Sequence, residues 1–194
     1  MFTGIIEEIG ELVSIEKEQS NIHFTVKADM SSELKVDQSL AHNGCCLTIV
    51  SKDDKQYTVT AIQETLDKTN LKDWELGSQL NLERCMKADG RFDGHIVQGH
   101  VDCIAECVGV EDLNGSWKFS FIYEAAHRTV EKGSVTINGT SLTVVDSAEN
   151  SFSVCIIPYT YKHTNFHELR AGSIVNIEFD IFGKYIQRYL NQIR

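Results

Sequence analysis

The segment Asn43-Gly44-Cys45-Cys46-Leu47-Thr48-Ile49-Val50 occurs a second time in the chain, with changes, as Asn138-Gly139-Thr140-Ser141-Leu142-Thr143-Val144-Val145. A shift of 95 residues, position 43 onto position 138, aligns the two copies without a gap. The same shift aligns residues on either side of the segment: Gly4 with Gly99, Phe24 with Phe119, Thr65 with Thr160, Asn70 with Asn165, Asn81 with Asn176 and Glu83 with Glu178. Self-similarity at a fixed offset marks a repeated structural unit, so the sequence predicts a tandem duplication.

Within each copy, apolar and polar residues alternate in short runs, as in 22–26 of the first copy and 117–123 of the second. A period of two is typical of half-buried strands. Turn residues such as Asp53-Asp54 and Asn114-Gly115 separate the runs. Several short strands in fewer than about 90 residues favour a small closed barrel, which leaves no exposed sheet edge. The predicted fold class is therefore all-β, with two tandem barrels.

The tail of the chain has a different pattern. Ile181, Tyr185, Tyr189 and Ile193 recur every four residues, which predicts an α-helix with a broad apolar stripe. The predicted domains are 1–90 for the first barrel, 91–181 for the second and 182–194 for the helix. From the residues alone, the helix either packs on its own domain or forms a contact between subunits.

The charge balance excludes several classes of function. The chain carries 28 Asp and Glu against 18 Lys and Arg, a net charge of −10, so binding to nucleic acid or to an anionic membrane surface is not expected. No apolar run approaches the roughly 20 residues of a membrane span, and the first residues do not read as a signal peptide. We expect a cytoplasmic protein whose six cysteines are reduced.

Motifs for metals and nucleotide cofactors are also missing. No phosphate-binding glycine loop is present. His163 and His167 are four residues apart but lack the glutamate of the H-E-x-x-H zinc motif, and His95 and His100 are five apart, which suits neither one helix face nor one strand face. Cys46 and His100 are the residue types of a thiol hydrolase, but no nucleophile-elbow motif surrounds Cys46. The sequence predicts neither a metal nor an organic cofactor.

The duplicated segment is the better candidate for a site. Asn-Gly is a strong hairpin signal, so each copy reads first as a turn followed by a strand. Residues two apart on a strand point to the same face, which places Cys46 beside Thr48 and Ser141 beside Thr143. Each module would thus present two small polar groups side by side, as in a polar ligand pocket.

Four segments together resemble the riboflavin synthase family of two-module lumazine-binding proteins: Met1–Ile6, Ala41–Thr48, Gly94–Asp102 and Asn138–Val144. The resemblance implies two six-stranded Greek-key barrels that each bind one lumazine, a homotrimer held by the C-terminal helices, and an active site between the first module of one subunit and the second module of the next. The implied reaction is a transferase step without cofactor, in which two molecules of 6,7-dimethyl-8-ribityllumazine give riboflavin and 5-amino-6-ribitylamino-uracil. It also implies lumazine synthase as a partner. The alternative is a non-enzymatic lumazine- or flavin-binding antenna protein.

The resemblance also implies the site residues. The first pocket would be formed by Gly4, Ile5, Ile6, Cys46, Leu47, Thr48, Thr60, Ala61, Ile62, Gln63, Glu64 and Thr65. The second would be formed by Gly99, His100, Val101, Lys132, Ser141, Leu142, Thr143, Ile157, Pro158, Tyr159, Thr160, Tyr161 and Lys162. The residues it associates with catalysis are Phe2, Cys46, His100, Ser141, Thr143 and Asp180. The sequence leaves open which side chain is the base, which delivers the nucleophile, and whether Cys45 or Cys46 faces the ligand.

Overall fold

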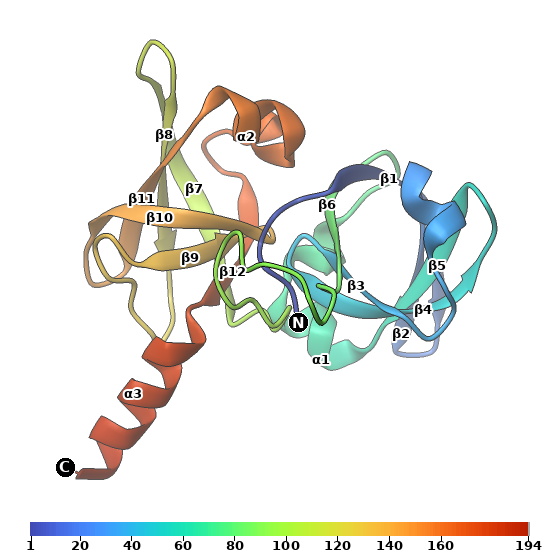
Figure 1. Cartoon of the computed structure of the whole chain (residues 1–194), viewed down its shortest axis with the longest axis horizontal. Coiled ribbons are helices and arrows are strands. Elements are labelled where there is room, and N and C mark those ends of the chain that lie inside the picture. Colours follow the sequence, from blue (N-terminus) through green and yellow to red (C-terminus); the bar gives the residue numbers. More distant parts are fainter. Residues whose placement is uncertain (194) are drawn as a thin grey trace.

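Two closed β-barrels lie side by side in the computed structural model, which describes residues 1–193 (Figure 1). The strands of the first barrel are β1 (Glu8–Glu18), β2 (Asn21–Lys27), β3 (Ser39–His42), β4 (Cys45–Lys52), β5 (Gln56–Ala61) and β6 (Gln79–Arg84). Those of the second are β7 (Cys103–Asp112), β8 (Trp117–Tyr123), β9 (Ser134–Ile137), β10 (Thr140–Ser147), β11 (Ser151–Ile156) and β12 (Ile174–Phe179). The first closes in the order β1-β2-β5-β4-β3-β6, and the second repeats that order as β10-β11-β8-β7-β12-β9. The predicted all-β fold of two tandem six-stranded barrels is confirmed.

Short helical segments connect β5 to β6 and β11 to β12. They are α1 (Gln63–Lys68) with the 3-10 turn η2 (Asn70–Asp73), and α2 (Pro158–His163) with η3 (Asn165–Glu168); a further turn, η1 (Asp29–Glu33), follows β2. The connection between the barrels, residues 85–102, lies outside the strands. The boundary predicted between residues 90 and 91 falls within this connection and stays a prediction, because the segment contacts both barrels.

Each barrel encloses its own apolar core, and the two cores are built from equivalent positions. Leu12, Phe24 and Val59 are fully buried in the first barrel, and the residues 95 positions later, Cys107, Phe119 and Val154, are fully buried in the second. Burial of alternate side chains along each strand is what gives the sequence its period of two.

The barrels are related by a pseudo-twofold axis. Phe2 and Val97, equivalent positions of the repeat, exchange two backbone hydrogen bonds, with N···O distances of 2.8 and 3.1 Å. Asparagine side chains farther along the junction make reciprocal hydrogen bonds between the barrels. The Asn81 amide donates to the Asn138 carbonyl at 2.9 Å, and the Asn176 amide donates to the Asn43 carbonyl at 2.9 Å. The asparagines common to both copies therefore join the barrels.

The helix α3 (Ile181–Ile193) extends from the second barrel and leads away from both barrels (Figure 1). Its predicted last residue, 194, lies outside the described residues. Near its start the helix is attached to its own barrel, because Lys184 pairs with Asp102 and Gln187 bonds to His127. Five of its apolar side chains are more than half exposed: Phe182, Tyr185, Ile186, Tyr189 and Leu190. None of the helices in residues 1–193 has the length and apolar character needed to cross a membrane.

Candidate functional site

Strand β4 presents Cys46 on its outer face and Cys45 toward the core. The turn before it has positive φ at both Asn43 and Gly44, 45° and 78°, as a tight two-residue hairpin requires. From there side chains alternate, so Cys45 packs in the barrel core, Cys46 is half-buried and Thr48 is exposed. Burial raises the pKa of the Cys45 thiol to about 12, which keeps it protonated. Cys46 is therefore the more accessible of the two thiols.

A cavity of about 250 Å³ opens beside Cys46. Three segments that are distant in sequence line it: the start of β4, the α1 region, and the connection between the barrels. The lining residues are Cys45, Cys46, Glu64, Thr65, Lys68, Thr69, Gly99, His100 and Val101.

The connection between the barrels crosses to the first barrel at this cavity. The Gly99 carbonyl accepts the Cys46 amide at 2.9 Å, and in the equivalent contact the Gly4 carbonyl accepts the Ser141 amide at 2.8 Å. Both glycines have φ of +79°, and a Cβ on either would lie within 2.6 Å of the facing Cβ. The leading segment of each module therefore lies against the other module's barrel, and only glycine fits there.

This crossing corrects the grouping of the pocket residues. The grouping of Gly4 with Cys46 and of Gly99 with Ser141 was wrong, because each glycine bonds to the opposite strand. The segment 99–101 belongs to the Cys46 site, and Gly4, which leads into Ile5 and Ile6, belongs to the Ser141 site. The reason is the pseudo-twofold exchange at Phe2 and Val97, which carries each chain segment across the axis.

Two buried glutamates hold the crossing segments in place. The carboxylate of Glu178 on β12 accepts the backbone N–H groups of Gln98, Gly99 and His100 at 2.7, 2.9 and 3.0 Å. Its repeat equivalent, Glu83 on β6, accepts those of Thr3 and Gly4 and the Thr3 hydroxyl. Burial raises the pKa of Glu178 to about 7 although the N–H donors oppose the change, and burial likewise raises the pKa of Glu83.

The second site centres on Ser141, which is half-buried on β10. The Ser141 hydroxyl lies 2.7 Å from Nδ1 of His95, and Nε2 of His95 lies 3.3 Å from the Thr136 hydroxyl. Burial lowers the pKa of His95, against the opposing charge of Asp180, so the imidazole is neutral at pH 7. A neutral imidazole bonded to a hydroxyl can pass a proton in either direction.

His95 was not among the residues predicted for the site. The repeat could not have indicated His95, because the offset of 95 residues places its equivalent before Met1, so the first copy has no residue to compare. Lys68 and Thr69, which line the Cys46 cavity, were also missed. Their signal was available, since Thr69 matches Thr164 in the repeat and Lys68 lies directly before it.

The structure places the remaining predicted residues as follows. Phe2 is fully buried beneath the Cys46 site, next to Ala41 and Val97. Thr143 is exposed on the Ser141 face of β10, whereas Leu47 packs into the barrel core. Asp180 accepts the Phe182 amide at the start of α3. The stretch 60–65 covers the end of β5 and the start of α1, and the stretch 157–162 lies at α2. Leu142 on β10 packs against the second core, Val101 packs against the first core, and Ile6 and Lys132 lie in the loops before β1 and β9. Ligand contacts by these residues stay predictions.

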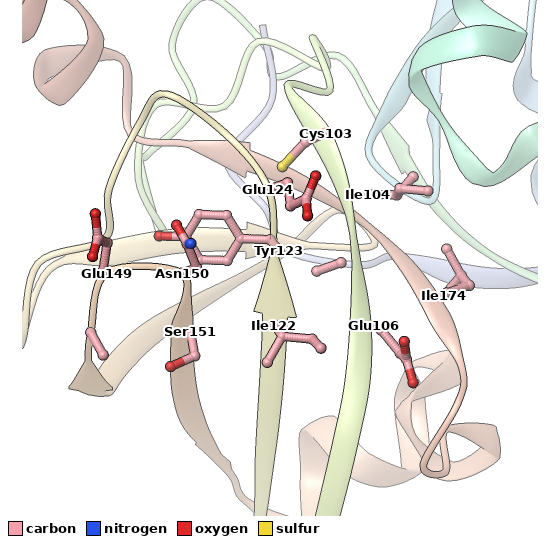
Figure 2. A pocket seen from close by; sticks show the side chains of 12 residues that line it. Cys103, Ile104, Glu106, Ile122, Tyr123, Glu124, Glu149, Asn150, Ser151 and Ile174 are labelled. Carbon is pink, nitrogen blue, oxygen red and sulfur yellow. The ribbon is translucent and has the colours of Figure 1, made fainter.

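A larger cavity lies elsewhere, on the second barrel (Figure 2). It measures about 720 Å³, and its labelled side chains come from β7, the end of β8 and the residue after it, the turn between β10 and β11, and the first residues of β11 and β12. Its walls combine isoleucines with the carboxylates of Glu106, Glu124 and Glu149. None of the predicted site residues lines it, so size alone does not identify the functional site. Across residues 1–193, no cluster of three or more His, Cys, Asp or Glu side chains could hold a metal ion.

Comparison with known proteins gives the same duplication. The model of the lumazine binding domain matches twice, at residues 3–85 and 98–180. The riboflavin synthase of Actinobacillus pleuropneumoniae is 43% identical over 193 residues, 98% of this chain and 90% of the relative. That of Bacillus subtilis is 40% identical over 195 residues, 99% and 91% of the two chains. Among solved structures, LumP complexed with 6,7-dimethyl-8-(1'-D-ribityl) lumazine has a TM-score of 0.85 over 92% of this chain and 99% of that chain; at 20% identity this likeness is one of fold.

Proposed function

Because this chain belongs to the riboflavin synthase family of proteins with two lumazine-binding domains, we propose that it converts 6,7-dimethyl-8-ribityllumazine into riboflavin. Two substrate molecules react, and a four-carbon unit passes from one to the other, leaving 5-amino-6-ribitylamino-uracil. The enzyme is therefore a transferase. The observation that carries the proposal is the pair of repeat-equivalent sites at Cys46 and Ser141, each completed by a glycine segment of the other module.

A reaction between two copies of one substrate requires two similar pockets. Holding both rings in contact makes the encounter effectively intramolecular, which can lower the barrier by several kcal/mol. The two sites differ in the groups they offer: Cys46, His100 and Lys68 at the first, and Ser141 with His95 at the second. This asymmetry suits a reaction in which one lumazine donates the four-carbon unit and the other accepts it.

The chemical roles follow from the groups present. The 7-methyl group of a bound lumazine is unusually acidic for a C–H, so a neutral imidazole such as that of His95 is base enough. The Lys68 ammonium at the Cys46 cavity can stabilise the resulting ring anion. The second ring is activated at C7 by water or by a hydroxyl or thiol, for which Ser141 and Cys46 are the candidates. Phe2 lies beneath the Cys46 site and acts by packing.

We further propose a homotrimer in which each active site joins the first barrel of one subunit to the second barrel of its neighbour. Cys46 and Ser141 are equivalent positions of the repeat and lie two residues beyond Gly44 and Gly139, which face each other at the junction of the barrels. Because the two sites are related by the pseudo-twofold axis, we place them in two different subunit interfaces. The exposed apolar side chains of α3 supply a contact surface for assembly. A cytoplasmic location and an association with lumazine synthase are part of the proposal.

The test is to incubate the purified protein with 6,7-dimethyl-8-ribityllumazine alone. We expect one riboflavin for every two lumazine molecules consumed, with undiminished rate in excess EDTA. An antenna protein would instead bind lumazine and leave it unchanged. Stable lumazine fluorescence without riboflavin would therefore overturn the proposal, and loss of activity in EDTA that zinc restores would overturn its cofactor-free form.

A further inference from the structure

The segment 98–102 forms one wall of the Cys46 cavity and is anchored at both ends. At its start, Glu178 accepts the amides of residues 98–100. At its end, the Asp102 amide donates to the Ile177 carbonyl at 2.8 Å, and the Asp102 carboxylate accepts the Phe179 amide at 2.8 Å. Every anchor lies on β12, directly before α3.

The first module contains an equivalent carboxylate, Glu7, and the cation that pairs with it is Arg84, the last residue of β6. Glu7, the equivalent of Asp102, accepts the Arg84 amide at 2.7 Å and also pairs with the Arg84 guanidinium at 2.6 Å. In the second module, position 84 of the repeat is Phe179, which carries no charge. Both modules therefore have a carboxylate at this position, but in the second module the adjacent strand has no cation to pair with Asp102.

Helix α3, which has no counterpart in the first module, supplies the missing cation. The Lys184 ammonium lies 2.6 Å from the Asp102 carboxylate, and the two side chains are only 16% and 18% exposed. The same ammonium lies close enough to Glu178 to oppose the rise in pKa that burial causes there. Lys184 thus pairs with one acidic anchor of the segment and opposes the pKa rise at the other.

We infer that Lys184 is a positioning residue that ties helix α3 to the wall of the first-barrel site. The seating of the helix on its own barrel then sets the position of Gly99 and His100. This inference rests on the proposed function for its catalytic consequence, because Lys184 lies outside the cavity and acts through Asp102. A helix that also mediates assembly would in this way couple assembly to the shape of the Cys46 site.

The competing explanation is a salt bridge that merely stabilises the fold. Removing Lys184 leaves the largely buried Asp102 carboxylate without its cation, which destabilises the protein under either explanation. The two explanations predict faster amide exchange in different parts of the protein. A structural role raises amide exchange throughout the second barrel, whereas a positioning role raises it first in 98–102.

The experiment compares Lys184→Met with Lys184→Arg and with Arg84→Met, which breaks the equivalent pair in the first module. Amide hydrogen exchange is measured on each full-length protein at a temperature where all remain folded. For Lys184→Met we expect exchange in 98–102 to accelerate by about tenfold or more, with 3–7 unchanged, and for Arg84→Met the reverse. Lys184→Arg should restore protection, because the cation returns.

The catalytic arm measures KM and kcat for the same proteins. We expect Lys184→Met to raise the KM for 6,7-dimethyl-8-ribityllumazine several-fold, while kcat, calculated per folded protein, falls by a smaller factor. Lys184→Arg should return both values toward those of the wild type. Uniform acceleration across the second barrel, or unchanged exchange in 98–102, would overturn the inference. Absence of riboflavin formation by the wild-type protein would instead reject the proposed function and leave the exchange result standing.

Discussion

Gly44 and Gly139 face each other across the pseudo-twofold axis, so closely that a Cβ built on either would lie 2.7 Å from the backbone nitrogen of the other. The contact is reciprocal, and both residues have positive φ, 78° and 80°. Each glycine is also the second residue of the hairpin turn that leads into the site strand of its barrel. The duplicated Asn-Gly pair therefore shapes two turns and one barrel junction.

Gly44→Ala should lower the free energy of unfolding by much more than the strain of placing alanine at a positive φ. Gly77 is the matched control, since its φ is +87° and a Cβ there would meet nothing within 4 Å. We expect Gly77→Ala to cost about 1–2 kcal/mol from backbone strain, and Gly44→Ala to cost at least about 2 kcal/mol more, because the junction must separate. Urea unfolding of both variants measures the difference. Equal losses would mean that the junction yields easily.

The repeat made the two barrels and their turns predictable, because strand period and turn residues are local properties of the sequence. It could not show that Gly4 contacts Ser141 rather than Cys46. The alignment of the two copies shows which positions are equivalent. It is the same whether each leading segment packs on its own barrel or crosses to the other barrel. The assignment of each glycine to a barrel depends on the exchange at Phe2 and Val97, which involves backbone atoms that any residue pair could supply.

Cys46→Ala should lower turnover at least about tenfold, whereas Cys45→Ala should mainly lower stability. Both cysteines border the cavity, but Cys46 is half-buried on the outer face, while Cys45 is buried in the barrel core, where loss of its sulfur costs about 1–2 kcal/mol. Cys46→Ser should retain more activity than Cys46→Ala, because the second module carries Ser141 at this position. Steady-state rates and thermal unfolding of the three variants test this, and a larger rate loss in Cys45→Ala would contradict it.

The stability of the protein should depend on the charge of Glu178. Its pKa is raised from 4.5 in the unfolded chain to about 7 in the fold, so folding favours the protonated form. The stabilisation that this group contributes is complete below pH 4.5 and is lost as the pH rises through about 7. At about 1.4 kcal/mol per pH unit, the loss is at most about 3 kcal/mol.

Glu178→Gln removes this titration and serves as the reference. The free energy of unfolding of the wild type, minus that of Glu178→Gln, should decrease between pH 4.5 and 8. Subtraction cancels the titration of the other carboxyl groups, which both proteins share. A difference that stays flat over this range would show that Glu178 titrates at an ordinary pH in the folded protein.

The exposed side of α3 should determine the oligomeric state. Replacing Tyr189 and Leu190 with lysine places two charges in the apolar stripe but leaves Lys184 and its pair with Asp102 intact. We expect the variant to fold and to bind lumazine, but to sediment as a smaller species with little activity, because buried charges oppose helix association. Replacement of Arg188, an exposed residue of the same helix, with lysine is the control. A variant that still forms trimers would show that the stripe does not hold the subunits together.

The placement of the active site between subunits can be tested by mixing two inactive proteins. One carries Cys46→Ala with His100→Gln, which the structure places together at the first-barrel site. The other carries Ser141→Ala with His95→Gln, which disable the second-barrel site. Each protein alone has one defective half in every active site and should be nearly inactive. The substitutions are close in size to the natural residues, so that neither barrel gains a large cavity.

Unfolding the two proteins together and refolding them allows mixed trimers to form. With equal amounts and random assembly, about a quarter of the interfaces join the sound first barrel of one chain to the sound second barrel of the other. Those interfaces should make riboflavin, so activity should return toward a quarter of the wild-type value, while proteins refolded separately and then mixed stay inactive. If both halves of a site came from one chain, every site would contain a defect however the chains were combined. Co-refolding would then restore nothing, and that result would reject the placement of the active site between subunits.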